Sequence, residues 1–243
     1  MLQKTIWSLW FQGWEGAPDL VKACRASWIL QNPDWTAHFL SQETLHKYVS
    51  ASPEFDGMYK KGYPIVVLSD VIRNELLTAY GGIWVDSTAY CLRPLNEWIN
   101  HALAPSGFFA FNQPGPDRML SNWFLATAER NNYITRVWLQ KTYTYWTNRV
   151  ERDKYYWHHQ LFSDAYQEDA TFRKLWDDTP KLSADGPHCF VPSREQLFKP
   201  VNGFHRLIVE TAQTPMLKLT HKLDHQLGVR GTAYRWLCER VGV

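Results

Sequence analysis

The residues best suited to chemistry lie in the segment SDVIRNELLTAYGGIWVDST, from Ser69 to Thr88. Asp70 and Arg73 are three residues apart, so on a helix they project from neighbouring points of one face. Asp86 follows a short apolar run and is expected at the carboxyl end of a strand. Open α/β sheets bind their ligands beside the carboxyl ends of the strands. These three residues are therefore the first candidates for a ligand site.

Two glycines separate the predicted helix from the predicted strand. Gly81 can adopt the left-handed conformation that ends a helix, and Gly82 lets backbone or a ligand approach closely. In the strand that follows, Trp84 and Asp86 point to the same side, because side chains alternate along a strand. The short strand is thus expected to deliver the carboxylate of Asp86 to its far end.

The same segment resembles the core motif of glycosyltransferase family 32 and, more closely, of the capsular-polysaccharide-synthesis glycosyltransferases related to it. The matching residues are Asp70, Arg73, Leu76, Leu77, Tyr80, Gly81, Gly82, Ile83, Trp84 and Asp86. The N-terminal stretch from Lys4 to Trp35 resembles the opening strand, Gln-Gly turn and Ala-Pro helix of the family. Weaker similarity lies at Ser121–Asn132 and Thr214–Leu223.

This resemblance implies an α/β protein with the GT-A fold, a Rossmann-like fold for nucleotide-diphospho-sugar transferases, and a helical C-terminal addition. It implies one domain over residues 1–243, with a nucleotide-sugar-binding half (1–112) and an acceptor-side helical half (113–243). The implied activity is metal-assisted transfer, with retained anomeric configuration, from a UDP-sugar donor to a capsular or lipopolysaccharide-type surface glycan. The acceptor would be a saccharide, free or lipid-linked.

The implied cofactor is a divalent cation, Mn²⁺ or Mg²⁺, that bridges the donor's phosphate oxygens and offsets their charge. Acidic residues at positions i and i+2 of a strand lie on one side, about 6–7 Å apart. Asp86 occupies the first position, but Thr88 occupies the second, as in the capsular relatives. Since magnesium-like ions accept one or two carboxylates together with phosphate oxygens and water, one carboxylate suffices for a metal held largely by the substrate.

The resemblance also assigns roles to other residues. Asp86, Arg73 and Asp70 form the predicted catalytic set, and Asp86 with Thr88 the predicted metal site. The predicted donor-binding set is Trp10, Gln12, Asp70, Arg73, Gly82, Asp86, Lys218 and His221, and the predicted acceptor-side residues are Asn122 and Trp123. Structural alternatives stay open: a strand-end cap or salt-bridge partner for Asp86, a helical ion pair for Asp70 and Arg73, and a core position for Trp10.

Composition narrows the class of protein. The 243 residues are 45% hydrophobic and 21% charged, which is typical of an ordinary soluble globular protein. The net charge of +2 argues against a nucleic-acid-binding protein dominated by phosphate contacts. The densest basic cluster, from Arg149 to Lys154, is interrupted by acids and is interpreted as a solvated helix face.

The sequence also favours a location. The N-terminus lacks an apolar signal segment, and no apolar run has the length of a membrane span. Four separated cysteines show no paired metal-ligand spacing, so reduced thiols in a cytoplasmic protein are expected. Peripheral contact with the inner face of the plasma membrane, through exposed aromatics and a lipid-linked acceptor, is compatible with this location.

The hydrophobic pattern and the positions of proline and glycine predict the order of the secondary-structure elements. Strands are expected at Thr5–Trp10, Trp35–Leu40 and Gly107–Phe111, and helices at 18–31, 94–100, 131–150, 155–166 and 210–227. Residues 50–63 are predicted to be irregular. The Pro- and Gly-rich stretch 177–203 is long enough to suggest a functional lid.

Two other functions compete with the transferase. A catalytically silent sugar-binding scaffold of a polysaccharide assembly complex is favoured by the missing second acid. A nucleotide-sugar hydrolase would release free sugar with or without an acceptor. The sequence contains no GxSxG, Walker or HExxH motif for other chemistry.

Overall fold

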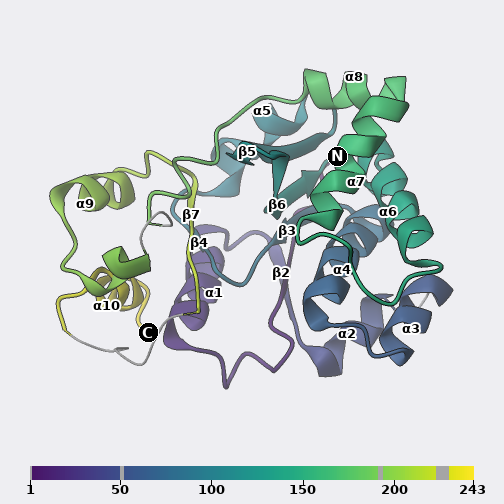
Figure 1. The fold of residues 1–243 in the computed structure, drawn as a ribbon. Helices are drawn as coiled ribbons and strands as arrows, with labels where there is room; N and C mark the ends of the chain where they lie inside the picture. The colour runs from purple at the N-terminus through teal and green to yellow at the C-terminus, as the bar shows by residue number, and fades with distance from the viewer. Residues whose placement is uncertain (1, 50–51, 191–193, 223–229) are drawn as a thin grey trace.

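The protein folds around a mixed β-sheet with helices on both faces (Figure 1). It is a computed structural model that describes residues 2–49, 52–190, 194–222 and 230–243. The strands of the main sheet are β1 (Thr5–Leu9), β2 (Thr36–Leu40), β3 (Gly82–Val85), β5 (Phe108–Gly115) and β6 (Arg118–Thr127). They are arranged in the order β2-β1-β3-β6-β5, where β1 is parallel to β2 and β3, and β6 is antiparallel to β3 and β5.

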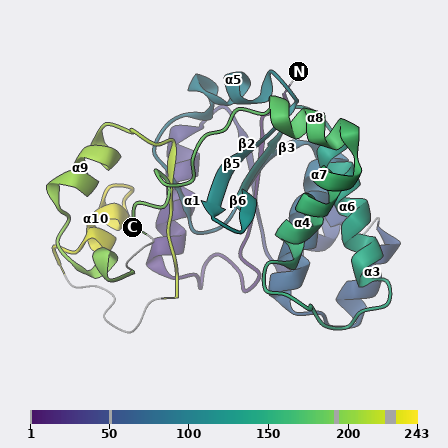
Figure 2. The same ribbon diagram turned by 45° about the horizontal axis from the view of Figure 1, so that its top comes forward.

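One face of the sheet is covered by a group of helices that lie together in Figures 1 and 2. These helices are α2 (Gln42–Val49), α3 (Pro53–Lys60), α4 (Ile65–Tyr80), α6 (Tyr133–Trp146), α7 (Trp157–Glu168) and α8 (Ala170–Asp178). Their apolar sides share one buried cluster with Trp7, Trp84 and Leu125 of the sheet. None of the helices in the described ranges is both long and apolar enough to cross a membrane.

The opposite face of the sheet is covered by α1 (Asp19–Gln31), the 3₁₀ turn η1 (Leu95–Glu97) and α5 (Ile99–Leu103). Trp28 of α1 packs there in one buried cluster with Ile83, Val85 and Phe109. Strand β3 therefore alternates as expected: Trp84 faces the first cluster, and its neighbours face the second.

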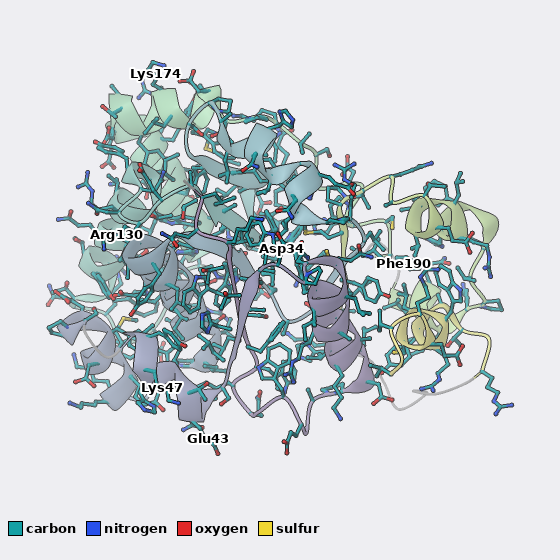
Figure 3. The ribbon with its side chains drawn as sticks, turned by 180° about the vertical axis from the view of Figure 1, so that it is seen from behind. Asp34, Glu43, Lys47, Arg130, Lys174 and Phe190 are labelled. Carbon is teal, nitrogen blue, oxygen red and sulfur yellow. The ribbon has the colours of Figure 1, made fainter. Side chains whose placement is uncertain are left out.

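The C-terminal part of the chain packs on the outer side of α1. It contains η2 (Arg194–Phe198), α9 (Gly203–Glu210) and α10 (Ala233–Glu239), and strand β7 (Met216–Lys218), which pairs antiparallel with β4 (Ala89–Cys91). Leu20 and Cys24 of α1 share a buried cluster with Phe190 and Leu237. Figure 3 shows Phe190 between α1 and the C-terminal helices.

Several predicted elements are confirmed, with shifts of a few residues at their ends. The expected strands at 5–10, 35–40 and 107–111 correspond to β1, β2 and β5, and the helices at 18–31, 131–150 and 155–166 to α1, α6 and α7. The expected short helix at 94–100 is divided between η1 and α5. In the range 177–203, Asp177 and Asp178 belong to α8 and Gly203 begins α9; among the described residues between them, η2 is the helical segment, so the lid stays a prediction.

Other predictions were wrong. Residues 53–60 of the supposedly irregular stretch form α3, because Pro53 suits a first helical turn and the Ser52 hydroxyl accepts a hydrogen bond from the Phe55 N–H. The predicted helix at 210–227 is also wrong: α9 ends at Glu210, and the chain continues through Pro215 into strand β7. Residues 223–227 of that prediction lie outside the described residues. Strand β6 and helix α8 were not predicted as elements.

The glycine turn between α4 and β3 is required by space as well as by conformation. Gly81 has φ 71° and ends α4, and Gly82 has φ 89°. A Cβ atom on Gly82 would lie 2.5 Å from the Thr5 carbonyl oxygen, and one on Gly81 would lie 2.9 Å from the Glu129 carbonyl carbon. The close approach that the sequence predicted at Gly82 is thus an approach of the β1 backbone.

Gly82→Ala is expected to lower the free energy of unfolding by at least ~2 kcal/mol, because alanine is strained at this φ and its methyl group would overlap β1. Urea denaturation measures the change. Gly57→Ala in α3 is the control, since its Cβ would meet open space, and it should change the stability by less than ~1 kcal/mol in the stabilising direction. Equal effects of the two substitutions would contradict the steric argument.

Candidate functional site

The site lies where the order of the parallel strands reverses. From β1 the chain passes through α1 to β2 on one side, then returns through α2–α4 to β3 on the other side of β1. Because α1 and α4 cover opposite faces, a crevice opens at the carboxyl ends of β1 and β3. A cavity of about 690 Å³ lies there, lined by residues that follow both strands, including Trp10 and Asp86.

Strand β3 delivers Asp86 to this cavity. The Asp86 N–H donates to the Trp123 carbonyl oxygen (2.8 Å), which continues the β3–β6 ladder by one bond. The Trp84 indole N–H donates to Asp86 Oδ1 (3.0 Å) from the same side of the strand. The backbone of Asp86 is thus held by the neighbouring strand, and its carboxylate is held by its own strand.

Arg73 lies at the centre of the polar contacts. Its Nη1 donates to the Asn122 carbonyl oxygen (2.8 Å) and lies 3.1 Å from Asp70 Oδ1. Its Nη2 lies 3.4 Å from the Ser69 hydroxyl and 3.5 Å from Asp86 Oδ1. Only 5% of Arg73 is exposed. The ion pair predicted on one helical face is present, and the same guanidinium also joins α4 to β3 and β6.

A second cation reaches Asp86 from the far end of the chain. Lys218 Nζ donates to Asp86 Oδ2 (3.0 Å) and to the Thr88 hydroxyl (2.6 Å). Lys218 is the last residue of β7, opposite Ala89 in the ladder with β4. Lys218, which was implied at the C-terminal side of the site, therefore contacts Asp86, although it lies in a strand and not in the expected helix.

Burial and the neighbouring charged groups set the protonation states of Asp86 and Asp70. Burial pushes the pKa of Asp86 upward, but Lys218, Arg73 and the Trp84 N–H together outweigh burial and hold this pKa below its usual range. Burial also raises the pKa of Asp70, and there Arg73 offsets it only in part, so the pKa of Asp70 is about 6. At neutral pH both acids are ionised, and Asp70 gains its proton first as the pH falls.

The histidines around the cavity are neutral. Burial, together with the charge of Arg73, lowers the pKa of His159 to about 3, and burial with the charge of Lys218 lowers that of His188 to about 4. His158 is fully buried against Trp138, and burial lowers its pKa well below its usual value. These imidazoles add no positive charge to the site at physiological pH.

Nearly all predicted site residues line this cavity at the carboxyl ends of β1 and β3. They are Trp10, Gln12, Asp70, Arg73, Asp86, Thr88, Asn122, Trp123, Lys218 and His221. Trp10 meets His221 edge to face, with ring centroids 5.1 Å apart. Gly82 is the exception and a correction: it lies at the other end of β3 from Asp86, outside the lining residues, and its close approach is to Thr5.

Other lining residues were missed by sequence reasoning. They include Ser69, Arg118, Ser121, Arg152, Tyr155, Tyr156, His159, His188 and Lys222. The cluster from Arg149 to Lys154 was interpreted as a solvated helix face. It instead follows α6 in an irregular segment that brings Arg152 and Tyr155 to the cavity. The two arginines followed by two adjacent tyrosines in this segment were the available signal.

The cavity carries an excess of positive charge. Among the described residues its lining contains the basic side chains Arg73, Arg118, Arg152, Lys218 and Lys222, and the acidic side chains Asp70 and Asp86. Both halves of the chain contribute to this lining. A cavity with more basic than acidic groups attracts anionic ligands.

Comparison with known proteins identifies the family. The model of the family described as capsular polysaccharide synthesis protein matches residues 1–236. The chain belongs to the capsular polysaccharide synthesis protein family. This membership confirms the resemblance that the segment from Asp70 to Asp86 indicated.

The chain is similar to proteins named as glycosyltransferases. The chain is 32% identical over 154 residues to the O-glycosyltransferase braB of Annulohypoxylon truncatum, covering 56% of this chain and 36% of that protein. It is 22% identical over 240 residues to the O-glycosyltransferase PaGT of Phomopsis amygdali, covering 92% of this chain and 50% of that protein. The chain therefore spans half or less of the length of these relatives.

A solved structure shares the fold. The PaToxG glycosyltransferase superposes with a TM-score of 0.52 at 14% identity, over 86% of this chain and 83% of that one. The predicted GT-A type of α/β fold is confirmed, and the predicted enzyme class agrees with the names of the relatives.

The residues around Asp86 do not fit the predicted divalent cation as they stand. Its two predicted ligands, Asp86 and Thr88, both accept hydrogen bonds from Lys218, and the other Asp86 oxygen faces Arg73. No group of three or more His, Cys, Asp or Glu side chains within the described ranges could hold a metal ion. The divalent cation therefore stays a prediction, and a cation between Asp86 and Thr88 would have to displace an ammonium group.

Asp70 should make the protein less stable as the pH rises from about 4 to about 6. The folded chain keeps the Asp70 proton up to about pH 6, whereas the unfolded chain loses it near the ordinary value of 3.8. In that window the unfolded state binds fewer protons, so the free energy of unfolding falls with rising pH. Urea denaturation at pH 4 and pH 7.5 should show wild type losing about 1–3 kcal/mol relative to Asp70→Asn. A difference that does not change with pH would contradict the raised pKa.

Proposed function

We propose that this chain transfers a sugar from a nucleoside diphosphate sugar, UDP-linked, to a hydroxyl group of a surface glycan. The observation that carries the proposal is the positively charged cavity of about 690 Å³ at the carboxyl ends of β1 and β3. A donor's diphosphate is anionic, and the membership in a capsular polysaccharide synthesis family supports a glycan as the acceptor class. The name O-glycosyltransferase of two relatives supports a hydroxyl oxygen as the acceptor atom.

On the donor side, the base is assigned to the end of the cavity formed by Trp10 and His221, which follow β1 and β7. Stacking of a base on an aromatic face contributes about 1–3 kcal/mol. Gln12 supplies amide groups for the base or ribose. Asp70, ionised at neutral pH, accepts hydrogen bonds from the hydroxyl groups of the donor sugar.

The diphosphate is assigned to the space beside Asp86, whose carboxylate contacts both Lys218 and Arg73. During transfer the bond between the sugar's anomeric carbon and the diphosphate oxygen breaks, and a bond from the acceptor oxygen to that carbon forms. The acceptor proton leaves with the diphosphate, and the nucleoside diphosphate is released. Departure and attack on the same face of the sugar would retain the anomeric configuration, as the family resemblance implies.

The acceptor is assigned to the side of the cavity formed by β6 and the segment after α6. Asn122 donates from Nδ2 to Asp70 Oδ1 (3.0 Å), so it orients the acid that holds the donor sugar. Trp123 and Ser121 line the cavity, and the indole N–H and the hydroxyl of these buried residues have no hydrogen-bond partner in the described part of the chain. Tyr155 and Tyr156 offer exposed rings on which saccharides can pack.

The proposal is tested by incubating the protein with a panel of UDP-sugars, with and without capsular or lipopolysaccharide acceptors. Glycosylated acceptor together with free UDP supports a transferase. Release of free sugar at the same rate with and without acceptor indicates a hydrolase instead. UDP binding without turnover of any donor would indicate the sugar-binding scaffold.

Asp86→Asn should lower transfer by 100-fold or more with little change in the thermal unfolding temperature. The amide keeps the shape of the side chain but removes the negative charge that Arg73 and Lys218 contact. Turnover of the preferred donor measures the loss. Asp178→Asn, at a surface ion pair with Lys174, is the matched control and should keep full activity. Near-normal transfer by Asp86→Asn would remove this residue from the active site.

A further inference from the structure

We propose that the ammonium group of Lys218 stands where a divalent cation would otherwise bind, and that this chain holds its donor's diphosphate without an added metal ion. This inference rests on the proposed function. It assigns the neutralisation of the diphosphate to a side chain of the chain itself.

The first argument for this proposal is the position of the Lys218 ammonium group. Asp86 and Thr88 occupy the two strand positions at which paired acids would hold a metal, and Lys218 Nζ donates to both of them, at 3.0 Å and 2.6 Å. A lysine ammonium has three N–H donors. Two of them are used by these contacts, so one donor is left for an oxygen of the phosphate.

The lysine is fixed in place by the backbone on both sides of it. Its own N–H donates to the Pro187 carbonyl oxygen (2.8 Å), and the N–H of Leu219 donates to the Thr88 carbonyl oxygen (2.8 Å). The ladder between β7 and β4 sets Lys218 opposite Ala89. These backbone hydrogen bonds fix the position of Lys218 in the site, whereas a mobile surface lysine would lack them.

The second argument is the charge that already surrounds Asp86. Asp86 already faces two cations, Lys218 on Oδ2 and Arg73 on Oδ1. The lining of the cavity has more basic than acidic side chains, so an approaching divalent cation meets repulsion. The substitution of Thr88 for a second acid fits the same logic, because a hydroxyl accepts a hydrogen bond from an ammonium without adding negative charge.

The diphosphate can be neutralised by the groups that are present. Beyond Lys218, the cavity lining supplies Arg152 and Lys222, neither of which faces Asp86 within 4.0 Å among the described ion pairs. Preorganised cations aimed at the place where charge develops stabilise a departing anion. A nucleoside diphosphate sugar therefore meets fixed positive charge on entry and on departure.

Calorimetric titration of the wild-type protein with UDP, in EDTA and in MnCl₂, tests the inference directly. Affinities that differ by less than tenfold between the two buffers are expected. A loss of tenfold or more in EDTA, restored by manganese, would overturn it. Transfer from the preferred donor should likewise persist in EDTA.

A pair of variants tests the lysine itself. Lys218→Met keeps the length of the side chain and removes the charge, and it should weaken UDP binding in EDTA by at least tenfold. The control Lys174→Met changes an exposed lysine on α8 that does not line the cavity and lies at the outer edge of the molecule in Figure 3, and UDP affinity should not change. A smaller loss for Lys218→Met would overturn the inference. If that variant fails to fold, the wild-type comparison of the two buffers still decides the question.

Different experimental results would contradict the proposed function and the inference about Lys218. If no UDP-sugar binds or reacts in either buffer, the proposed function is wrong. If binding and transfer occur only with manganese or magnesium, the proposed function stands and the lysine inference falls.

Discussion

The site depends on one half-buried carboxylate held between two cations. Asp86 at the end of β3 meets Arg73 from α4 on one oxygen and Lys218 from β7 on the other. The contacts of Asp86 therefore connect the helical layer, the sheet and the C-terminal strand, and a change in any one of them reaches the cavity.

The apolar framework explains how these charges come together. Alternation along β3 sends Trp84 to the same side as Asp86, where its indole supports both the carboxylate and the guanidinium of Arg73, which lies 5.3 Å from the ring centroid. The opposite side of the strand packs against α1 and α5. Because both faces of the sheet are closed by helices, the polar groups are confined to the carboxyl edge of the strands, where a ligand can reach them.

Local signals in the sequence were sufficient for the N-terminal part of the site. The glycine turn, the short strand and the helical spacing of Asp70 and Arg73 involve residues close together in the chain, and all three are found as predicted. The strand-helix alternation likewise predicted β1, α1 and β2. Patterns of this kind depend on backbone preferences and periodicity, which a sequence displays directly.

Contacts between distant segments could not be predicted in the same way. Lys218 and Asp86 are 132 residues apart, and nothing local to Met216–Lys218 says that this segment adds an antiparallel strand to β4. A short apolar run is ambiguous between helix and strand, and pairing with β4 decided the outcome. Arg152 was misread for a similar reason, since its basic neighbours suggested a surface helix and only tertiary packing brings the segment after α6 to the cavity.

The pairing of β7 with β4 has a consequence for the order in which the molecule is completed. The ribosome makes β4 long before β7, so a nascent chain that has formed the main sheet still presents Asp86 without its lysine. If the proposed function holds, the site for the diphosphate is therefore completed late in synthesis, when the residues around Lys218 emerge. An unfinished or C-terminally clipped chain would lack the contact between Lys218 and Asp86, on which the proposed diphosphate site depends.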